Sequence, residues 1–463
     1  MNSMNDTIAA ISTPLGQGGI GIVRLSGRAS LAIADRIFTP RTGAGPSACR
    51  SHTVHYGFVK VPGKDEIVDE ALLTVMCSPQ TYTTEDVVEI NCHGGLMPLK
   101  RVLELCLKEG ARLAEPGEFT KRAFLNGRMD LSQAEAVLDL INAQTDTSRK
   151  VALDQLRGSI SGEIRGIRGS ILDILSLIEL TIDFSQEDVH FPERDNITGR
   201  VEEISRSLRR MLETSEKGMV LREGASVVIC GRPNAGKSSL MNALLRHDRV
   251  IVTPVAGTTR DVIEEAIVIS GVKVRLSDTA GIVETHDRVE IEGVKRSRER
   301  LACADVVIFM LDSSLPLSRK DKEIYNTIRD KRMVIVANKT DLPSALDMDE
   351  ARRRFKRDDI LGVSVLEKKG LEDIEDAVAA KLFSGSMGSL TEGPVITNLR
   401  HKRSLEKAAE SIERALSVTG ADYNAELLAS DLKEAAHQLG LVIGESVEDD
   451  ILDRIFSQFC IGK

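Results

Sequence analysis

The sequence has no tryptophan, and aromatic residues make up only 3% of its 463 positions. Broad aromatic platforms for stacking nucleic-acid bases are therefore not expected. Its seven cysteines lie far apart and form no C-x-x-C pair, which argues against a disulfide framework or a zinc site. No apolar run approaches the roughly 20 residues that cross a bilayer, and the first residues lack a signal-peptide pattern. We expect a cytoplasmic protein that does not enter the membrane.

The overall charge is acidic, because 70 Asp and Glu against 61 Lys and Arg give a formal net charge of −9. This excludes a protein that coats nucleic acid through bulk positive charge. Local basic clusters remain at residues 352–357 and 206–210. Each cluster is either an RNA contact or a solvated helix face, and the sequence leaves both interpretations open.

The sequence pattern changes three times along the chain, which defines four stretches. Residues 1–124 mix short β-branched runs with turn residues and predict an α+β domain. Residues 125–223 show helical periodicity, and residues 224–385 alternate apolar strands with amphipathic helices, as in a parallel sheet covered on both faces. Residues 386–463 are helical again. We therefore expect an α/β and α multidomain chain in which a P-loop α/β domain is inserted between two halves of a helical domain.

One helical stripe is especially regular. Its isoleucines recur at spacings of three and four residues and predict the core of a helical bundle. They are Ile160, Ile164, Ile167, Ile171, Ile174 and Ile178.

A phosphate-binding motif, G-x-x-x-x-G-K-S, occupies residues 231–238. It follows an apolar strand and opens a helix, which is the context that the motif requires. Glycines let backbone N–H groups close around phosphate oxygens at the start of a helix. We expect Lys237 to neutralise the β- and γ-phosphates and Ser238 to offer its hydroxyl to Mg²⁺.

Two further motifs predict which nucleotide is bound. Asp278 begins Asp-Thr-Ala-Gly after an apolar strand, where its carboxylate can reach the Mg²⁺ shell. Asp341 ends Asn-Lys-Thr-Asp after a later strand, and its carboxylate can accept hydrogen bonds from N1–H and the 2-amino group of guanine. Adenine has no such donor pair. Ser364 opens a weaker candidate for a base-contacting loop. Three motifs in this order resemble the GTPase superfamily of translation-factor and Era type and predict GTP binding.

The predicted chemistry of hydrolysis differs from that of a Ras-like enzyme. Ile282 stands where a glutamine orients the attacking water, and no arginine finger is evident. The acidic loop of residues 284–292 supplies candidate carboxylates or is a solvated surface. Asn234 can help hold K⁺ against the phosphates, which would stabilise transition-state charge as an arginine does. Residues 253–261 fit the first switch loop, in which a threonine hydroxyl completes the Mg²⁺ shell.

The two ends of the chain carry distinctive segments. Gly16, Gly18 and Gly21 match a dinucleotide-binding motif, but strand-like sequence follows where that motif needs a helix, so we reject this interpretation. The sequence ends in Cys-Ile-Gly-Lys. Cys460 is either a chemically active group or a packed, buried thiol.

Together these features resemble the MnmE (TrmE) family of tRNA-modification GTPases. The resemblance rests on Asp-Thr-Ile at position 6, residues 18–24, 89–95, 116–127, 231–239 and 256–261, and the terminal Cys-Ile-Gly-Lys. The match runs from end to end, in order, with the same inserted-domain arrangement. It implies an N-terminal folate-binding domain that also forms the homodimer, a helical domain and an inserted G domain.

The resemblance also implies a reaction. Family members act with an FAD-containing partner, MnmG (GidA), in a heterotetramer-type complex, and FAD is bound by the partner only. They add a carboxymethylaminomethyl or aminomethyl group to C5 of the wobble uridine of certain tRNAs. A tetrahydrofolate derivative, in its 5,10-methylene or formyl form, supplies the one-carbon unit. GTP hydrolysis is required, and K⁺-dependent dimerisation of the G domains activates it.

By the same resemblance, individual residues receive expected roles. Glu290 falls at the position of the catalytic glutamate, and Lys237 and Cys460 are the other candidate catalytic residues. The expected K⁺ ligands are Asn234, Thr253, Val255 and Thr258, and the expected Mg²⁺ ligands are Ser238 and Thr259. The expected folate-binding residues are Arg24, Glu85, Arg128 and Lys463. The expected GTP-binding residues are Asn234, Ala235, Gly236, Lys237, Ser238, Ser239, Thr253, Pro254, Val255, Ala256, Gly257, Thr258, Thr259, Asp278, Thr279, Ala280, Gly281, Asn338, Lys339, Asp341, Ser364, Val365 and Leu366.

Two departures from the family pattern stand out. Arg128 replaces a lysine of some relatives, which keeps the charge but changes the hydrogen-bond geometry. Val283 replaces an arginine of some members, so no role for that arginine is expected here.

Two other functions stay open on the sequence. One is a switch GTPase of ribosome assembly, in which the terminal Cys-Ile-Gly-Lys segment and the glycine-rich start have no use. The other is a folate-dependent one-carbon transferase that uses GTP only as a regulator, which predicts turnover without the FAD-containing partner.

Overall fold

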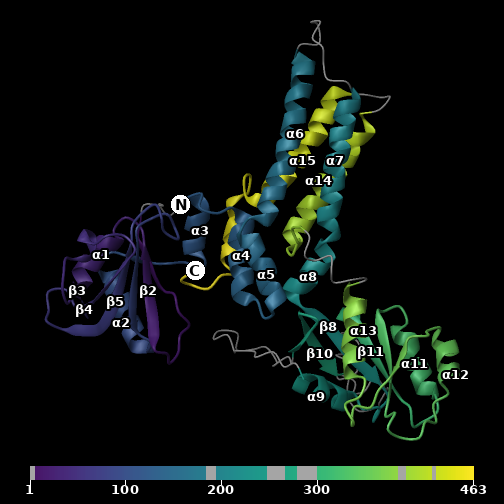
Figure 1. Cartoon of the computed structure of the whole chain (residues 1–463). Coiled ribbons are helices and arrows are strands. Elements are labelled where there is room, and N and C mark those ends of the chain that lie inside the picture. The colour runs from purple at the N-terminus through teal and green to yellow at the C-terminus, as the bar shows by residue number, and fades with distance from the viewer. Residues whose placement is uncertain (1–5, 184–193, 248–265, 279–299, 384–392, 420–423) are drawn as a thin grey trace. The chain divides into compact units, whose positions relative to one another are not determined.

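A computed structural model describes residues 6–183, 194–247, 266–278, 300–383, 393–419 and 424–463 (Figure 1). The chain divides into two compact units, Met1–Leu138 with Gly440–Lys463, and Asp139–Leu439. The predicted mixture of helical and α/β parts is confirmed. The predicted domain borders at residues 124, 223 and 385 stay a prediction.

Seven strands of the first unit form one sheet in the order β3-β4-β5-β6-β2-β1-β7. Helices α1 and α2 bury their apolar sides on the sheet and complete its core. Side chains alternate along a strand, so Val23 and Leu25 of β2 enter this core, whereas Arg24 faces the other way, opposite Glu89 of β6. The elements are β1 (Ile8–Ile11), β2 (Ile20–Ser26), α1 (Ser30–Ile37), β3 (Phe38–Pro40), η1 (Pro46–Ala48), β4 (Thr53–Lys60), β5 (Ile67–Met76), β6 (Val87–His93), α2 (Leu96–Lys108), β7 (Arg112–Leu113), α3 (Glu118–Leu125) and α4 (Leu131–Asn142).

The C-terminal segment packs within this first unit. Helix α16 (Asp449–Phe456) contacts α3, and Ile461 forms a β-bridge with Pro116. Two glycines make the close approach possible. Gly117 has φ +68°, and a Cβ there would lie 2.6 Å from the Phe456 carbonyl oxygen. Gly462 has φ +95°, and a Cβ there would lie 2.4 Å from the Ile11 carbonyl oxygen. The terminal segment is therefore fixed beside β1 and α3.

The second unit contains a helical bundle, in which α6, α7, α14 and α15 run side by side (Figure 1). All six isoleucines of the predicted stripe lie on α6 and are buried, so this prediction of a bundle core is confirmed. Among the helices that the structure describes, none is both long enough and apolar enough to span a bilayer. The bundle elements are α5 (Asp146–Leu156), α6 (Ser159–Asp183), α7 (Arg194–Glu213), α8 (Ser215–Glu223), α14 (Leu399–Ser417) and α15 (Ala425–Ile443).

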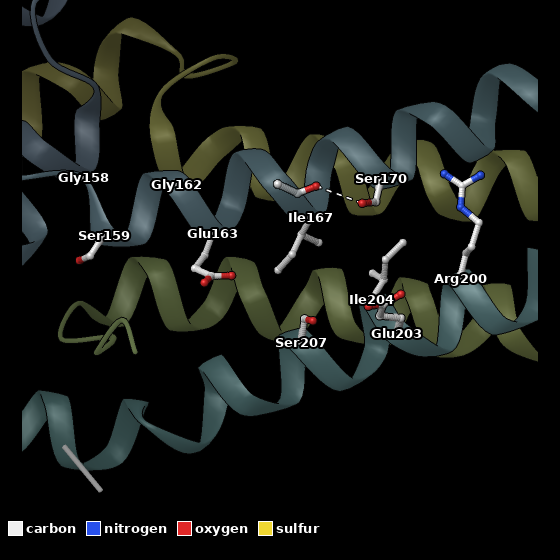
Figure 2. A pocket seen from close by; sticks show the side chains of 11 residues that line it. Gly158, Ser159, Gly162, Glu163, Ile167, Ser170, Arg200, Glu203, Ile204 and Ser207 are labelled. Atoms are coloured by element: carbon white, nitrogen blue, oxygen red, sulfur yellow. Dashed lines mark hydrogen bonds between the residues drawn. The ribbon is translucent and has the colours of Figure 1, made fainter. Parts of the chain in front are cut away.

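A groove with a volume of about 570 Å³ lies between α6 and α7 (Figure 2). Gly162 and Gly166 line it, and a Cβ added to either would meet no atom of another described element within 4 Å. The Ser170 hydroxyl donates to the Gly166 carbonyl oxygen over 3.2 Å. None of the predicted site residues that the structure describes lines this groove.

Between α8 and α14 the chain forms a six-stranded sheet in the order β13-β12-β11-β8-β10-β9. All neighbours are parallel except β9 and β10. One core cluster lies beneath α9 and α13, and the other lies beneath α11 and α12. This is the predicted parallel sheet covered on both faces. Its elements are β8 (Ala225–Gly231), α9 (Lys237–His247), β9 (Ala266–Ile269), β10 (Val272–Asp278), β11 (Val306–Asp312), α11 (Arg319–Ile328), β12 (Met333–Asn338), α12 (Met348–Phe355), β13 (Ile360–Gly362) and α13 (Leu371–Phe383).

Candidate functional site

The phosphate-binding motif forms a loop between the end of β8 and the start of α9. Its backbone requires glycine at two points. Gly231 has φ +153°, with a Cβ position 2.4 Å from the Met310 carbonyl oxygen, and Gly236 has φ +99°, with a Cβ position 2.3 Å from Asn338 Nδ2. The Lys237 ammonium is largely buried and donates to the Arg232 carbonyl oxygen over 3.0 Å. The loop thus presents a helix start and a lysine together, as an anion site requires.

The loop is anchored from the side by an ion pair. Arg232 Nε lies 2.9 Å from Oδ1 of Asp321, which is fully buried at the start of α11. Asp321 also forms the capping box of α11 with Ser318. Residue types alone did not indicate this anchor, because Arg232 and Asp321 are 89 positions apart in the sequence.

A hydroxyl and a carboxylate meet beside the loop. Ser238 Oγ donates to Asp278 Oδ2 over 2.7 Å, although the two residues belong to α9 and β10. The other carboxylate oxygen, Oδ1, is buried and has no hydrogen-bond partner within the described part of the chain. An orphaned oxygen next to a serine hydroxyl fits Mg²⁺, which prefers oxygen ligands. Ser238 and Asp278 are therefore suited to hold this ion directly or through water.

The base-recognition motifs close a cavity of about 630 Å³ with α9. Asn338 is buried and links two loops, because its Nδ2 donates to the Ala235 carbonyl oxygen (2.9 Å) and its Oδ1 accepts from the Val365 amide (3.2 Å). The Ser364 hydroxyl donates to Asp341 Oδ1 over 2.6 Å. The structure thus brings Asn338, Asp341 and the loop at 364–366 together. Ser239, Lys339, Asp341, Val365 and Leu366 all line the cavity.

Lys339 is held by a partner that the sequence motifs did not indicate. Its ammonium lies 2.6 Å from Oδ2 of Asp312, which is buried at the end of β11. Burial raises the pKa of Asp312, but hydrogen bonds from Lys339 and Ser314 outweigh this effect, so its pKa lies below the ordinary value. The ionised pair fixes the stem of Lys339 along the cavity.

Several predicted site residues lie outside the residues that the structure describes. They are Thr253, Pro254, Val255, Ala256, Gly257, Thr258, Thr259, Thr279, Ala280, Gly281 and Glu290. Asn234 is described. It is exposed in the phosphate loop and has a left-handed backbone with φ +65°.

A second cluster of predicted residues lies in the first unit, around the ring of Tyr82. The Arg128 guanidinium lies 4.7 Å from the ring centroid, and that of Arg24 lies 5.8 Å away. Arg24 is also paired with Glu89 over 2.8 Å and lies 5.6 Å from the Phe119 ring. Tyr82 was not among the predicted residues. Tyr82 could not be recognised from the sequence, because a single aromatic residue forms no motif with two arginines that are distant in the chain.

The end of the chain reaches the same cluster. Arg24 Nη1 donates to the Gly462 carbonyl oxygen over 3.3 Å, which places Lys463 beside Arg24. Burial and the neighbouring Arg24 charge lower the pKa of the Lys463 ammonium. Cys460 is exposed, so the interpretation of Cys460 as a packed, buried thiol is wrong. Its carbonyl, not its thiol, makes the contact with α3, by accepting from the Gly117 amide over 3.4 Å.

Glu85 belongs to the loop that carries Tyr82, but its carboxylate is occupied by protein groups. It accepts from Ser26 Oγ over 2.6 Å and lies 3.1 Å from Arg122 Nη1. Arg122 is buried and also pairs with Asp6 and Glu118. The structure therefore brings Arg24, Arg128 and Lys463 together, whereas Glu85 faces a buried ionic network that the sequence did not indicate.

The parallel sheet, the phosphate loop and the cavity with its Asn338 and Asp341 side chains define a nucleotide-binding protein of the P-loop GTPase class. Two family profiles match the chain: "GTP-binding protein TrmE N-terminus" over residues 7–128 and "MnmE helical domain" over residues 131–460. The chain belongs to the MnmE (TrmE) family of tRNA modification GTPases.

Relatives match over the full length of the chain. A protein of Lactiplantibacillus plantarum named tRNA modification GTPase MnmE is 47% identical over 99% of this chain and 98% of its own. The protein of that name from Alkaliphilus oremlandii is 45% identical over 99% of this chain and 100% of its own. Among solved structures, a variant of Aquifex aeolicus Era bound to GDP and AlF4⁻ is 28% identical, covering 40% of this chain and 66% of that chain, with a TM-score of 0.29.

Proposed function

We propose that this chain is the GTP-hydrolysing component of a complex that modifies tRNA. With the FAD-containing partner MnmG, it adds a carboxymethylaminomethyl or aminomethyl group to C5 of the wobble uridine, using a one-carbon unit from a tetrahydrofolate derivative. The observation that carries this proposal is the presence in one chain of both a guanine-type cavity and the cationic cluster around Tyr82. The relatives that match from end to end carry the name tRNA modification GTPase.

In the cavity, each described side chain has a distinct task. Asp341 accepts hydrogen bonds from guanine N1–H and the 2-amino group, while Ser364 keeps its carboxylate oriented. Adenine would leave this carboxylate without donors, which is the basis for discrimination against ATP. Lys237 neutralises the terminal phosphates, and Ser238 with Asp278 holds Mg²⁺, joined by Thr259. The bound ion would neutralise charge that develops on the phosphate oxygens.

Hydrolysis needs a cation and a water-orienting group. We assign the cation to K⁺, held by Asn234 with Thr253, Val255 and Thr258, and the orientation of water to Glu290, because Ile282 cannot form a hydrogen bond. Two copies of the G domain face each other when the cation is bound.

Two measurements test this arrangement. Replacement of K⁺ by Na⁺ should reduce the rate of GTP hydrolysis sharply, and equal rates would count against the K⁺ assignment. Glu290→Ala should abolish hydrolysis and leave GTP affinity nearly unchanged, whereas a large drop in affinity would point to a structural role.

The cluster around Tyr82 is suited to a folate. Arg24, Arg128 and Lys463 supply positive charge for the anionic glutamyl tail, and the Tyr82 ring supplies an apolar face for a planar group. Glu85 is the remaining predicted ligand, and its carboxylate is held by Ser26 and Arg122.

A binding measurement with a matched control tests the folate assignment. Arg128→Ala should weaken the binding of 5-formyltetrahydrofolate in calorimetry at least tenfold, because one charge-assisted hydrogen bond contributes about 1.5–3 kcal/mol. Arg41→Ala is the control, since the Arg41 guanidinium also lies over an aromatic ring, 5.7 Å from the centroid of Tyr56. Equal affinities of the two variants would remove the cluster from the site.

The two competing functions predict different outcomes in cells and in reconstitution. A ribosome-assembly switch predicts that wobble-uridine modification persists in cells that lack the gene. A transferase that uses GTP only as a regulator predicts modification without the FAD-containing partner. We expect modification to need both this chain and the partner. Cys460→Ser tests the chemical role of the thiol, because full modification by this variant would exclude it.

A further inference from the structure

The last turn of α12 and the two residues that follow the helix carry an unusual charge pattern. Five of the six residues from 352 to 357 are Lys or Arg, and the exception is Phe355. Phe355 is buried, and its ring lies 4.5 Å from that of Tyr325 and 5.7 Å from that of Phe309, measured between centroids. Because Phe355 fixes the inner side of the helix, the cations lie outside, and Arg353, Arg354 and Lys356 are exposed.

Helix α11 supports α12 from the side (Figure 1). The Tyr325 hydroxyl donates to the Phe355 carbonyl oxygen over 2.5 Å, and Lys322 pairs with Glu350 over 3.3 Å. These contacts connect the two helices at both ends of α12. The side chains of residues 353, 354, 356 and 357, called the α12 basic surface below, are therefore displayed on a rigid support.

Little acidic charge neutralises this surface. Arg352 is paired with Asp349 (3.3 Å), and Asp359, which follows the cluster, is paired with Lys381 (3.0 Å). No carboxylate in the described ranges lies within ion-pair distance of Arg354, Lys356 or Arg357. Asp358 is the one carboxylate adjacent to the cluster in the sequence whose side chain is not already paired within those ranges. The α12 basic surface therefore keeps a net positive charge.

Helix stability does not account for so many cations. A positive charge in the last turn contributes about 0.3–1 kcal/mol through the helix dipole. However, Lys356 (φ +51°) and Arg357 lie beyond the end of the helix, and the effect of the dipole falls off within its last turn. The dipole thus favours one or two cations at this helix end, and the additional ones need another explanation.

A polyanion fits this surface. The whole chain has a net charge of −9, so a nucleic acid is repelled unless it meets a locally positive region. Arginine is well suited to phosphate, because its planar guanidinium donates two parallel hydrogen bonds. The surface also precedes the start of β13, whereas the phosphate loop follows the end of β8. Because these strands run parallel, the two features lie at opposite ends of the strands. Binding here leaves the nucleotide cavity accessible.

We infer that the α12 basic surface binds the phosphate backbone of tRNA. The inference rests on the proposed function, in which tRNA is the substrate, and adds the part of this chain that contacts it. The contact is independent of base sequence and positions the tRNA, while the choice of uridine is made elsewhere.

The test uses the full chain with three neutralising substitutions, Arg354→Gln, Lys356→Gln and Arg357→Gln. An unmodified tRNA transcript is titrated between 50 and 200 mM KCl and followed by fluorescence anisotropy. For each phosphate that the variant no longer binds, the slope of log K against log salt should become shallower by about 0.9. At 0.1 M salt this corresponds to a loss of tRNA affinity that is close to tenfold per phosphate. The rate of GTP hydrolysis without tRNA should be unchanged.

The matched control removes the same charge from the other basic cluster. Arg206, Arg209 and Arg210 are exposed on α7, and their replacement by Gln should leave tRNA affinity and salt slope as in the wild type. The inference is wrong if the α12 variant binds like the wild type, if the α7 variant shows as large a drop in affinity, or if the wild type does not bind the transcript. It is also wrong if the α12 variant keeps tRNA affinity but no longer associates with the partner protein, since the surface would then recognise an acidic protein.

Failure of this inference is distinguishable from failure of the proposed function. Wobble-uridine modification in cells that lack the gene tests the function without reference to α12. A protein that restores modification but has no measurable affinity at the α12 basic surface would overturn the inference alone.

Discussion

The substitution Asn338→Ala tests the arrangement of the nucleotide cavity, because this one amide connects its two sides. Asn338 is 3% exposed, donates to the Ala235 carbonyl oxygen of the phosphate loop and accepts from the Val365 amide of the base loop. Alanine removes both hydrogen bonds and leaves two backbone groups without partners. Each such group costs about 1–3 kcal/mol, so the expected total is about 2–6 kcal/mol.

This free energy divides between folding and binding. We expect the affinity for a fluorescent GTP analogue to fall at least tenfold, which corresponds to about 1.4 kcal/mol. The remainder should appear as a lower free energy of unfolding of residues 225–383, measured by hydrogen exchange of their peptides in increasing urea. Both measurements use the full chain in the same buffer.

Asn242→Ala is the matched control. Asn242 lines the same cavity from α9 but is exposed, and no side-chain hydrogen bond holds it within the described residues. Its replacement should change affinity and stability by less than about 0.5 kcal/mol. If Asn338→Ala were as mild as the control in both measurements, the reasoning about the two loops would be refuted.

Three further predictions follow from other contacts. Tyr82→Leu removes the ring beneath Arg24 and Arg128. Each lost cation–π contact is worth about 0.5–1 kcal/mol, so folate binding should weaken about 5- to 30-fold in calorimetry. Tyr82→Phe should retain most of the affinity, and equal losses in the two variants would show that the hydroxyl, not the ring, matters. Burial raises the pKa of Glu118, but hydrogen bonds from Arg112, the Glu115 amide and Arg122 outweigh this effect, so its pKa lies below its ordinary 4.5. The stabilisation that ionised Glu118 contributes is thus complete above pH 4.5 and is lost as pH falls through the lower pKa of the folded state. Glu118→Gln should therefore make the hydrogen-exchange protection of β1 less sensitive to acid. The same loss of protection at low pH in this variant and in the wild type would contradict this. Gly236→Ala should abolish GTP binding, because φ +99° is strained for alanine and its Cβ position lies 2.3 Å from Asn338 Nδ2; measurable binding by filter assay would speak against this geometry.

The part of the chain that binds the nucleotide, residues 225–383, could be predicted well because its sequence motifs are local. The loop at residues 231–238 contains its own glycines and lysine, and the apolar runs before it and before Asn338 specify parallel strands. The six-isoleucine stripe likewise predicted the bundle core, since helical spacing and burial follow from the same periodicity.

The supporting contacts could not be predicted, because they join residues that are distant in the sequence. Asp312 holds Lys339, Asp321 holds Arg232, and Arg122 pairs with Glu85, each across a gap of more than 25 residues. No periodicity connects such pairs. Their existence depends on which strands and helices the fold brings together.

The C-terminal segment shows the same limit. Its sequence suggested an unusual cysteine but did not show whether the thiol is packed. In the structure Gly462 and Gly117 bring the segment close to β1 and α3, the backbone makes the contacts, and the side chain of Cys460 stays exposed.

The central claim is that guanine recognition by this chain supports modification of the tRNA wobble uridine. The most direct measurement is mass spectrometry of tRNA nucleosides from cells that lack the gene, complemented with the wild type, Asn338→Ala or Asn242→Ala. The account predicts that the modified uridine disappears on deletion, returns with the wild type and Asn242→Ala, and stays low with Asn338→Ala. An unchanged level of the modified uridine in the deletion cells would contradict it.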